Sequence, residues 1–310
     1  MVADASESTF ARHYPTIMPL LLNVLRNTVD GAEEGRREYQ RLRVKAMECA
    51  VLAAIAVGRD VFRPDSSALI EWLVRIQKSP TDPNDTQPTY YLISTWAKIG
   101  QALGEEFEPY LSLVMRSILA TASAKTGVSA YEDNDEEAKT EREGWETVTV
   151  DGRTTGIKTS ALEEKCQAFE TLLIYCSTLG GKYALYLSQT LEICLPCLKF
   201  HSHEGVREAS AMPVPRLLDC GKQSNTLTTQ MVTAAFNQLI ACIRSEPDSS
   251  FLASLYKCFT ELLLVIGGPS NPPQEYHLGI IQSTKHQLQT LADKRKTRAA
   301  RLERSSSAGA

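Results

Sequence analysis

Hydrophobic residues recur along most of this chain with the spacing of amphipathic helices. The clearest face consists of Phe107, Tyr110, Leu111, Val114, Met115, Ile118, Leu119 and Ala122. Steps of three and one that repeat in this way place side chains on one side of a helix with about 3.6 residues per turn. The same spacing predicts helices at 13–28, 42–57, 162–179 and 183–198, and near 225–244 and 249–266.

One segment, 146–159, alternates instead in the manner of β-strands. Val148 and Val150 alternate with threonines and are followed by Asp151-Gly152, a residue pair typical of hairpin turns. Because this is the only strand-like signal, the pattern as a whole predicts an all-α chain.

The predicted helices come in pairs, and the pairs repeat. Glycines that end a helix and open a polar link stand at positions 58, 104, 180, 221 and 267, which gives spacings of 46, 76, 41 and 46. The long spacing holds an insert of 76 − 46 = 30 additional residues. A two-helix unit of about 40–47 residues is the period of HEAT repeats. The second helices also align, because Phe10, Phe107 and Tyr183 take equivalent positions in them.

We therefore predict an all-α HEAT-repeat solenoid of the armadillo-like, right-handed superhelical type, with about five helix pairs after a leading helix. Repeats of this kind stack on their neighbours and form a long concave surface, along which solenoids usually bind other proteins. The array is expected to span 1–292, with an acidic insert at about 124–158. Residues 293–310 are expected to form a basic helix end and a flexible tail.

Composition and charge narrow the class of protein. The 310 residues carry a net charge of −4, which argues against attraction of the whole surface to nucleic acid or anionic lipid. No apolar run reaches the roughly 18 residues needed to cross a bilayer, and the polar, acidic start predicts no secretory signal. The eight cysteines are then expected to be reduced thiols in the cytosol or nucleus. We expect neither a membrane nor a nucleic acid as a direct partner.

The stretch CLPCLKFHSH, residues 194–203, is the candidate metal site. Zn²⁺ accepts thiolate and imidazole ligands, so a zinc-binding protein built on Cys194, Cys197, His201 and His203 is a minor alternative, and a redox pair is another. However, all eight cysteines fall in amphipathic stretches, where a thiol acts as a small hydrophobe. Zinc sites of this type also return their second ligand pair from about a dozen or more residues away. We therefore interpret the stretch as a helix end and expect no metal.

Catalytic motifs are not found in the chain. It contains no phosphate-binding glycine loop, no dinucleotide fingerprint, no H-E-x-x-H and no G-x-S-x-G, and its five histidines are scattered. We therefore expect a protein that is not an enzyme and that uses no cofactor.

Two charged segments stand out. Residues 131–146 hold eight acidic and two basic residues, and residues 293–304 hold six basic and two acidic residues. The acidic run is either a solvated loop or an arm that attracts basic segments of a partner, with a tryptophan as an anchor at its edge. The basic run is either the polar face of the last helix or a nuclear-localisation or nucleic-acid patch. The candidate partner-binding residues are Asp133, Asp135, Glu136, Glu137, Glu141, Glu143 and Trp145.

The order of several motifs resembles the importin beta-3 branch of the karyopherin-β nuclear import receptors. In this chain the motifs read RLRVKAMECAVLAAIAVGRDVF, YYLISTWAKIGQALGEEFEPYLSLVM, GWETVTVDGRTTGIKTSALEEKCQAFETLL and LPCLKFHSHEGVREASAMPVPRLL. The most distinctive piece is the acidic run followed by Gly144-Trp145-Glu146 and Gly156-Ile157-Lys158-Thr159. The resemblance covers residues 10–290 and corresponds to the middle of the HEAT array in those receptors, which are several times longer.

The resemblance implies a non-enzymatic section of a nuclear import receptor that shuttles between cytoplasm and nucleus through the nuclear pore. Its implied partners are cargo proteins with basic localisation signals, Phe-Gly nucleoporins and, for the full-length receptor, Ran-GTP. The family's main Ran contacts lie in amino-terminal repeats that this chain does not match. The alternative is a HEAT scaffold subunit of another complex, of the phosphatase or chromatin type.

Overall fold

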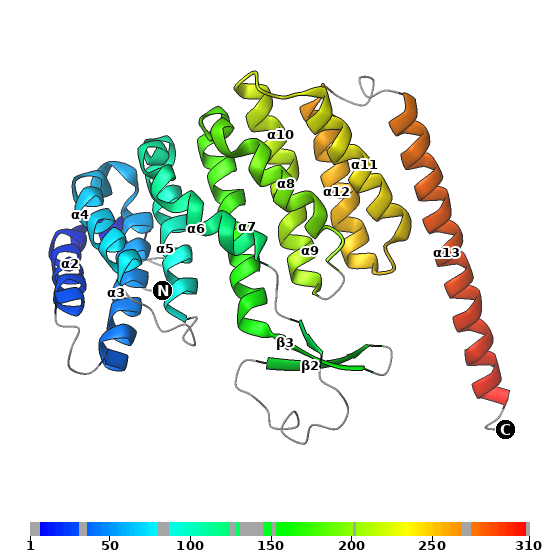
Figure 1. Ribbon diagram of the computed structural model, residues 1–310, viewed down its shortest axis with the longest axis horizontal. Helices are drawn as coiled ribbons and strands as arrows, with labels where there is room; N and C mark the ends of the chain where they lie inside the picture. Colours follow the sequence, from blue (N-terminus) through cyan, green and yellow to red (C-terminus); the bar gives the residue numbers. More distant parts are fainter. Residues whose placement is uncertain are drawn as a thin grey trace. The chain divides into compact units, whose positions relative to one another are not determined.

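In a computed structural model, the protein folds into two compact units, Met1–Tyr186 and Leu187–Ala310 (Figure 1). The structure describes residues 7–30, 36–79, 87–124, 128–130, 145–150, 153–200, 203–267 and 274–307. Helix is the dominant element in these ranges, and strands occur in one place.

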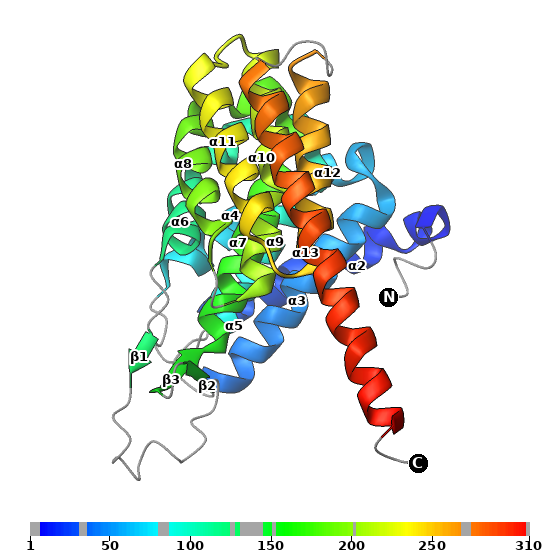
Figure 2. The same cartoon turned by 90° about the vertical axis from the view of Figure 1, so that its right-hand side faces the viewer.

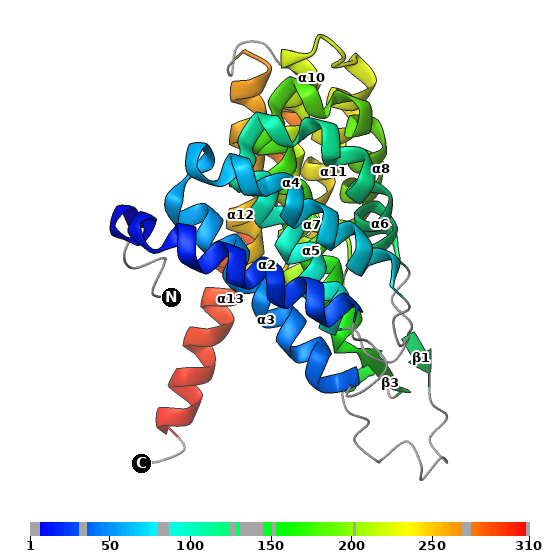
Figure 3. The same ribbon diagram turned by 90° about the vertical axis from the view of Figure 1, so that its left-hand side faces the viewer.

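The first unit consists of paired helices and a small sheet. Its α-helices are α2 (Tyr14–Asp30), α3 (Arg36–Val57), α4 (Arg59–Lys78), α5 (Gln87–Leu103), α6 (Leu111–Ser123) and α7 (Thr159–Leu179). Its 3-10 turns are η1 (Glu7–Arg12), η2 (Gly104–Tyr110) and η4 (Gly180–Tyr186). α3 packs against α5 and α5 against α7, so these three helices form one layer (Figure 1). α2 packs on α3 and α4, which begins a second layer (Figure 3).

A three-stranded antiparallel sheet follows α6 and precedes α7. It consists of β1 (Val128–Ala130), β2 (Trp145–Val150) and β3 (Arg153–Lys158), in the order β1-β3-β2. β2 and β3 pair from Trp145 opposite Lys158 to Val150 opposite Arg153. Only two residues, 151–152, link the strands, so the predicted hairpin is confirmed.

The described part of the second unit consists of six helices. They are α8 (Leu187–Cys197), α9 (Glu204–Ala211), α10 (Pro213–Gln223), α11 (Thr229–Ser245), α12 (Ser249–Val265) and α13 (Gln274–Ser307). α10 packs against α8 and α12, and α11 contacts α8, α12 and α13 (Figure 2). α9 and α10 follow each other almost without a break, and Pro213 separates them because it has no N–H with which to continue the hydrogen bonding of α9.

The second helices of several pairs begin in the same way. A 3-10 turn precedes α2, α6 and α8, and an aromatic ring in each turn is buried: Phe10 is 8% exposed, and Phe107 and Tyr183 are both 0% exposed. The predicted alignment of these second helices is confirmed. The helix predicted from Phe107 differs in its first turn, which is 3-10 rather than α. Tighter turns of this kind are frequent at helix ends, where the α-helical hydrogen bonds are incomplete.

Four of the five predicted glycine stops have the left-handed backbone that favours glycine. Gly58, Gly104, Gly180 and Gly267 have φ angles of 78°, 61°, 52° and 105°. A residue with a Cβ would be less stable there by about 1–2 kcal/mol. Glycine therefore allows the chain to leave each helix at a sharp angle and enter the next one.

The prediction is wrong at Gly221, which lies inside α10. The left-handed residue after this helix is Asn225, with a φ angle of 56°, and asparagine adopts this backbone more readily than most residues. Gly221 instead permits close packing, since a Cβ there would lie 2.9 Å from Leu187 Cδ2 and 3.2 Å from Leu227 Cβ.

We expect Gly221→Ala to lower the free energy of unfolding by about 1–3 kcal/mol, because the added methyl group must displace a packed leucine. Asn225→Gly is the control, since glycine suits its backbone, and it should change that free energy by less than about 0.5 kcal/mol. Urea denaturation followed by far-UV circular dichroism measures both changes. Wild-type stability in Gly221→Ala would show that the neighbouring leucines move aside without cost.

The last helix, α13, includes the basic stretch of the sequence. Residues 291–300 are exposed, among them Lys294, Arg295, Lys296 and Arg298. Figure 2 shows this part of α13 extending past the other helices of its unit. The division of the chain into an array of 1–292 and a basic end of 293–310 remains a prediction. Within the described residues, none of the helices has the length and apolar character needed to span a membrane.

Candidate partner-binding site

The predicted partner-binding residues belong to the segment between α6 and α7. Trp145 is the first residue of β2 and pairs with Lys158 of β3. The other six lie outside the described residues: Asp133, Asp135, Glu136, Glu137, Glu141 and Glu143. The structure therefore describes the support of this segment, which consists of the end of α6, the small sheet and the start of α7 (Figure 1).

A buried lysine joins α6 to α7, the two helices that flank this segment. Lys165 of α7 is 3% exposed, and its Nζ donates hydrogen bonds to the carbonyl oxygens of Ala122 and, over 3.1 Å, of Ala124. These carbonyls end α6, where the helix dipole favours a positive charge. The ammonium also lies 5.7 Å from the ring centre of Phe169. These contacts tie the end of α6 to α7, so the segment starts and finishes at a common base.

Contacts between neighbouring helix pairs recur at one distance along the sequence. The Gln238 side chain donates to the carbonyl of Leu195 over 3.0 Å, and Gln287 donates to that of Ile243 over 2.7 Å. These partners are 43 and 44 residues apart. Each side chain binds carbonyl groups near the end of a helix in the preceding pair. The predicted repeat period is therefore confirmed by contacts as well as by helix order.

Exposed ion pairs connect α4 to the turn η2, and η2 to the turn η4, in the first unit. Arg63 Nε donates to Glu106 over 2.9 Å, and Lys182 Nζ lies 3.2 Å from Glu105 and 3.4 Å from Glu108. Each of these side chains is at least 40% exposed. Such pairs contribute about 0–1 kcal/mol each. The turns thus present a mixed charge rather than a strong electrostatic site.

The stretch 194–203 is a helix end, as predicted. Cys194 and Cys197 lie in the last turn of α8, and Cys194 is buried. His203 is the N-cap of α9, where its Nδ1 accepts a hydrogen bond from the Val206 N–H over 3.2 Å. Among the described residues, no group of three or more His, Cys, Asp or Glu side chains is placed to hold a metal ion. His201 lies outside the described residues.

Several other cysteines have the properties of hydrophobic side chains. Burial raises the pKa of the Cys166 and Cys242 thiols to about 11, and it raises the pKa of Cys258 further. A thiol with a raised pKa remains protonated at neutral pH, which disfavours both metal binding and nucleophilic attack. All eight cysteines lie in helices, in agreement with the sequence interpretation.

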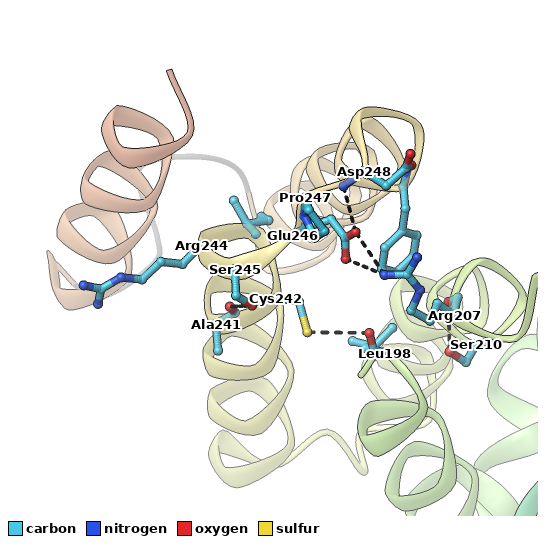
Figure 4. Close-up of polar contacts among 12 residues, drawn as sticks. Leu198, Arg207, Ser210, Ala241, Cys242, Arg244, Ser245, Glu246, Pro247 and Asp248 are labelled. Carbon is cyan, nitrogen blue, oxygen red and sulfur yellow. Dashed lines mark hydrogen bonds and ion pairs between the residues drawn. The ribbon is translucent and has the colours of Figure 1, made fainter. Parts of the chain in front are cut away.

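A buried ion pair in the second unit was not predicted from the sequence. Arg207 of α9 donates to both carboxylate oxygens of Glu246, over 2.9 and 2.7 Å, and the two residues are only 8% and 6% exposed (Figure 4). The guanidinium also lies over the ring of Phe251, 4.7 Å from its centre. The N–H of Asp248 donates to the same carboxylate over 3.0 Å. The ion pair therefore joins α9 to the turn between α11 and α12.

A sequence signal for these buried charges did exist. Lys165 stands three residues after Leu162 and four before Phe169, on the apolar face of α7. Arg207 likewise stands four residues before the buried Ala211 on α9. A charged residue at such a position indicates burial with a partner. The partner itself could not be identified, because it lies about forty residues away in the chain.

Comparison with curated proteins identifies relatives among the importins. No family model matches the chain. The chain is 36% identical over 252 residues to the importin subunit beta-3 of Saccharomyces cerevisiae. This match covers 79% of the chain and 22% of the yeast protein. It is 24% identical over 279 residues to a probable importin-5 homolog of Dictyostelium discoideum, and this match covers 86% of the chain and 24% of that protein.

Comparison with solved structures leads to the same group. The crystal structure of Kap121p matches with a TM-score of 0.82 and 30% identity, over 96% of this chain and 28% of that chain. Other matching structures show Kap121p bound to RanGTP, to Pho4p and to Nup53p. The chain spans about a quarter of the length of the proteins that it matches.

These similarities confirm the predicted fold class, an all-α HEAT-repeat solenoid. They also agree with the motif order on which the family resemblance was based. The chain belongs to the importin beta-3 branch of the karyopherin-β family.

Proposed function

We propose that this chain is a section of a nuclear transport receptor, which binds protein partners and catalyses no reaction. The observation that supports this proposal best is the similarity to Kap121p over 96% of the chain, since Kap121p has been solved with RanGTP, Pho4p and Nup53p. For the full-length protein we propose cargo with basic localisation signals, Phe-Gly nucleoporins and Ran-GTP as partners. Such a receptor works in both cytoplasm and nucleus and shuttles through the nuclear pore.

Within this chain, we assign the attraction of basic partners to the acidic run at 131–146. Its eight acidic and two basic residues give a local charge of −6, against −4 for the whole chain. A concentrated charge increases the rate at which an oppositely charged segment arrives more than it increases the final affinity. Lys165 joins α6 to α7, the helices between which this run lies in the sequence.

The test removes this charge. Changing six acidic residues together to Ser or Asn should slow association with a lysine-rich peptide by about tenfold or more at low salt. The difference should shrink near physiological ionic strength, where the Debye length is about 8 Å. Stopped-flow fluorescence at two salt concentrations measures both rates. The residues to change are Asp133, Asp135, Glu136, Glu137, Glu141 and Glu143.

A control variant makes the same change of net charge elsewhere. It neutralises six exposed acidic residues of the helices and turns: Glu38, Asp60, Glu71, Glu105, Glu108 and Glu192. This variant should associate at close to the wild-type rate. Equal slowing in both variants would assign the effect to net charge alone. Association of the first variant at the wild-type rate at low salt would show that the segment is only a spacer.

Trp145→Ala tests separately whether this tryptophan anchors the bound partner. The substitution should increase the dissociation rate.

A further inference from the structure

Among the described residues, the small sheet has two edge strands, β1 and β2, and β2 is the longer of them. In the order β1-β3-β2, β3 is paired on both sides, whereas β2 has no strand on its outer side among the described residues. All six residues of β2 pair with six consecutive residues of β3, so the register contains no bulge. The outer side of β2 is therefore a continuous row of backbone donors and acceptors.

The register determines which backbone groups face outward. Val150 and Arg153 stand opposite each other with two residues between them, so they form the hydrogen-bonded pair that closes the hairpin. Hydrogen-bonded pairs alternate along an antiparallel ladder, which directs every second residue of β2 toward β3. The N–H and C=O groups of Trp145, Thr147 and Thr149 consequently face the open edge.

β2 lacks two of the features that usually protect an edge strand. Its sequence, WETVTV, contains no proline and no lysine. Four of its six residues are β-branched threonine or valine, which suit an extended backbone. Its one charged residue is Glu146. The strand is thus well suited to accept a further strand along its outer side.

We propose that the outer edge of β2 takes up an extended segment of a partner protein as a fourth strand, and that this segment carries lysine or arginine. Strand addition supplies backbone hydrogen bonds that do not depend on side-chain identity. The preference for a basic segment comes from Glu146, the one charged residue of β2. A second copy of β2 would bring the same negative charge, which disfavours pairing between copies. The inference rests on the proposed function, in that basic segments are the ligands, and adds how they bind.

The experiment uses the full chain and a synthetic peptide of about nine residues, in which lysine and valine alternate and which is long enough to span β2. Hydrogen exchange of the Thr147 and Thr149 amides, followed by NMR, should slow by about tenfold or more when the peptide binds. The amides of Val148 and Val150 already face β3 and should change little. The same peptide with every backbone amide methylated keeps its charge but cannot donate hydrogen bonds, so it should give no protection.

A pair of variants separates backbone from side-chain effects. Thr147→Pro/Thr149→Pro removes two outward N–H groups and keeps those directed at β3, a position where an edge strand tolerates proline. It should bind the peptide about tenfold more weakly or worse. Thr147→Ala/Thr149→Ala removes the same side chains but keeps both N–H groups, and it should bind with nearly the affinity of the wild type.

Each contrary outcome has its own meaning. The peptide could bind without changing amide exchange in β2, and the proline variant could keep full affinity for it. That result would overturn strand addition but leave the proposed binding of basic segments intact. Equal protection by a peptide with glutamate in place of lysine would retain strand addition but overturn the basic preference, and with it that part of the proposed function. Protection that rises with protein concentration alone would assign the edge to a second copy. Absence of binding by either peptide would overturn the inference as a whole.

Discussion

Arg207→Met is expected to lower the free energy of unfolding by about 3–5 kcal/mol, because it leaves the carboxylate of Glu246 buried without its ionic partner. The guanidinium donates to both oxygens of that carboxylate, and neither residue is more than 8% exposed. Water therefore cannot replace the missing donor. Methionine is apolar and similar in length, so the loss reports the charge more than the volume.

The measurement is urea denaturation followed by circular dichroism, with two further variants as controls. Arg207→Met/Glu246→Gln removes both charges and should recover part of the lost stability. Arg207→Lys keeps the charge but loses the planar contact with Phe251 and should fall between the wild type and the methionine variant. Because the pair lies in the second unit, amide exchange should accelerate within Leu187–Ala310 and not within Met1–Tyr186. Unfolding of Arg207→Met at the wild-type urea concentration would show that the ion pair does not stabilise the fold.

Lys165→Met should lower the free energy of unfolding by about 2–3 kcal/mol, the range for lost hydrogen bonds to a charged group. The variant keeps the length of the side chain but leaves the carbonyls of Ala122 and Ala124 without their ammonium donor. It also removes the positive charge from the carboxyl-terminal end of α6. Amide exchange in the last turn of α6 should therefore accelerate before the unit unfolds as a whole.

Lys222→Met is the matched control for this change. Lys222 also donates to a backbone carbonyl 43 residues away, that of Val265, but it is exposed. Since water can replace an exposed donor, this variant should lose less than about 0.5 kcal/mol. Equal losses in the two lysine variants would mean that burial is not the source of the effect at Lys165.

Much of the fold could be predicted because it depends on residues that are close together in the chain. The face from Leu111 to Ala122 repeats with every helical turn, and Val148 and Val150 alternate ahead of a two-residue link. The period of the helix pairs and the order of motifs were visible in the same way. Gly221 was misassigned because glycine occurs both at left-handed helix ends and at close helix contacts, and the local sequence is compatible with either role.

The sequence by itself therefore determined the helices, their pairing, the hairpin and the family, whereas only the tertiary structure decided which charged residues are buried and what they contact. Arg207 meets Glu246 across 39 residues, and Lys165 meets Ala122 across 43. Likewise, WETVTV predicts a strand, but the order β1-β3-β2 decides which of its edges is open. The physical reason is the separation along the chain of the residues that interact. Helix and strand patterns follow backbone geometry that repeats every few residues, while contact partners depend on how distant segments stack, and a shift of one residue would give each side chain a different neighbour.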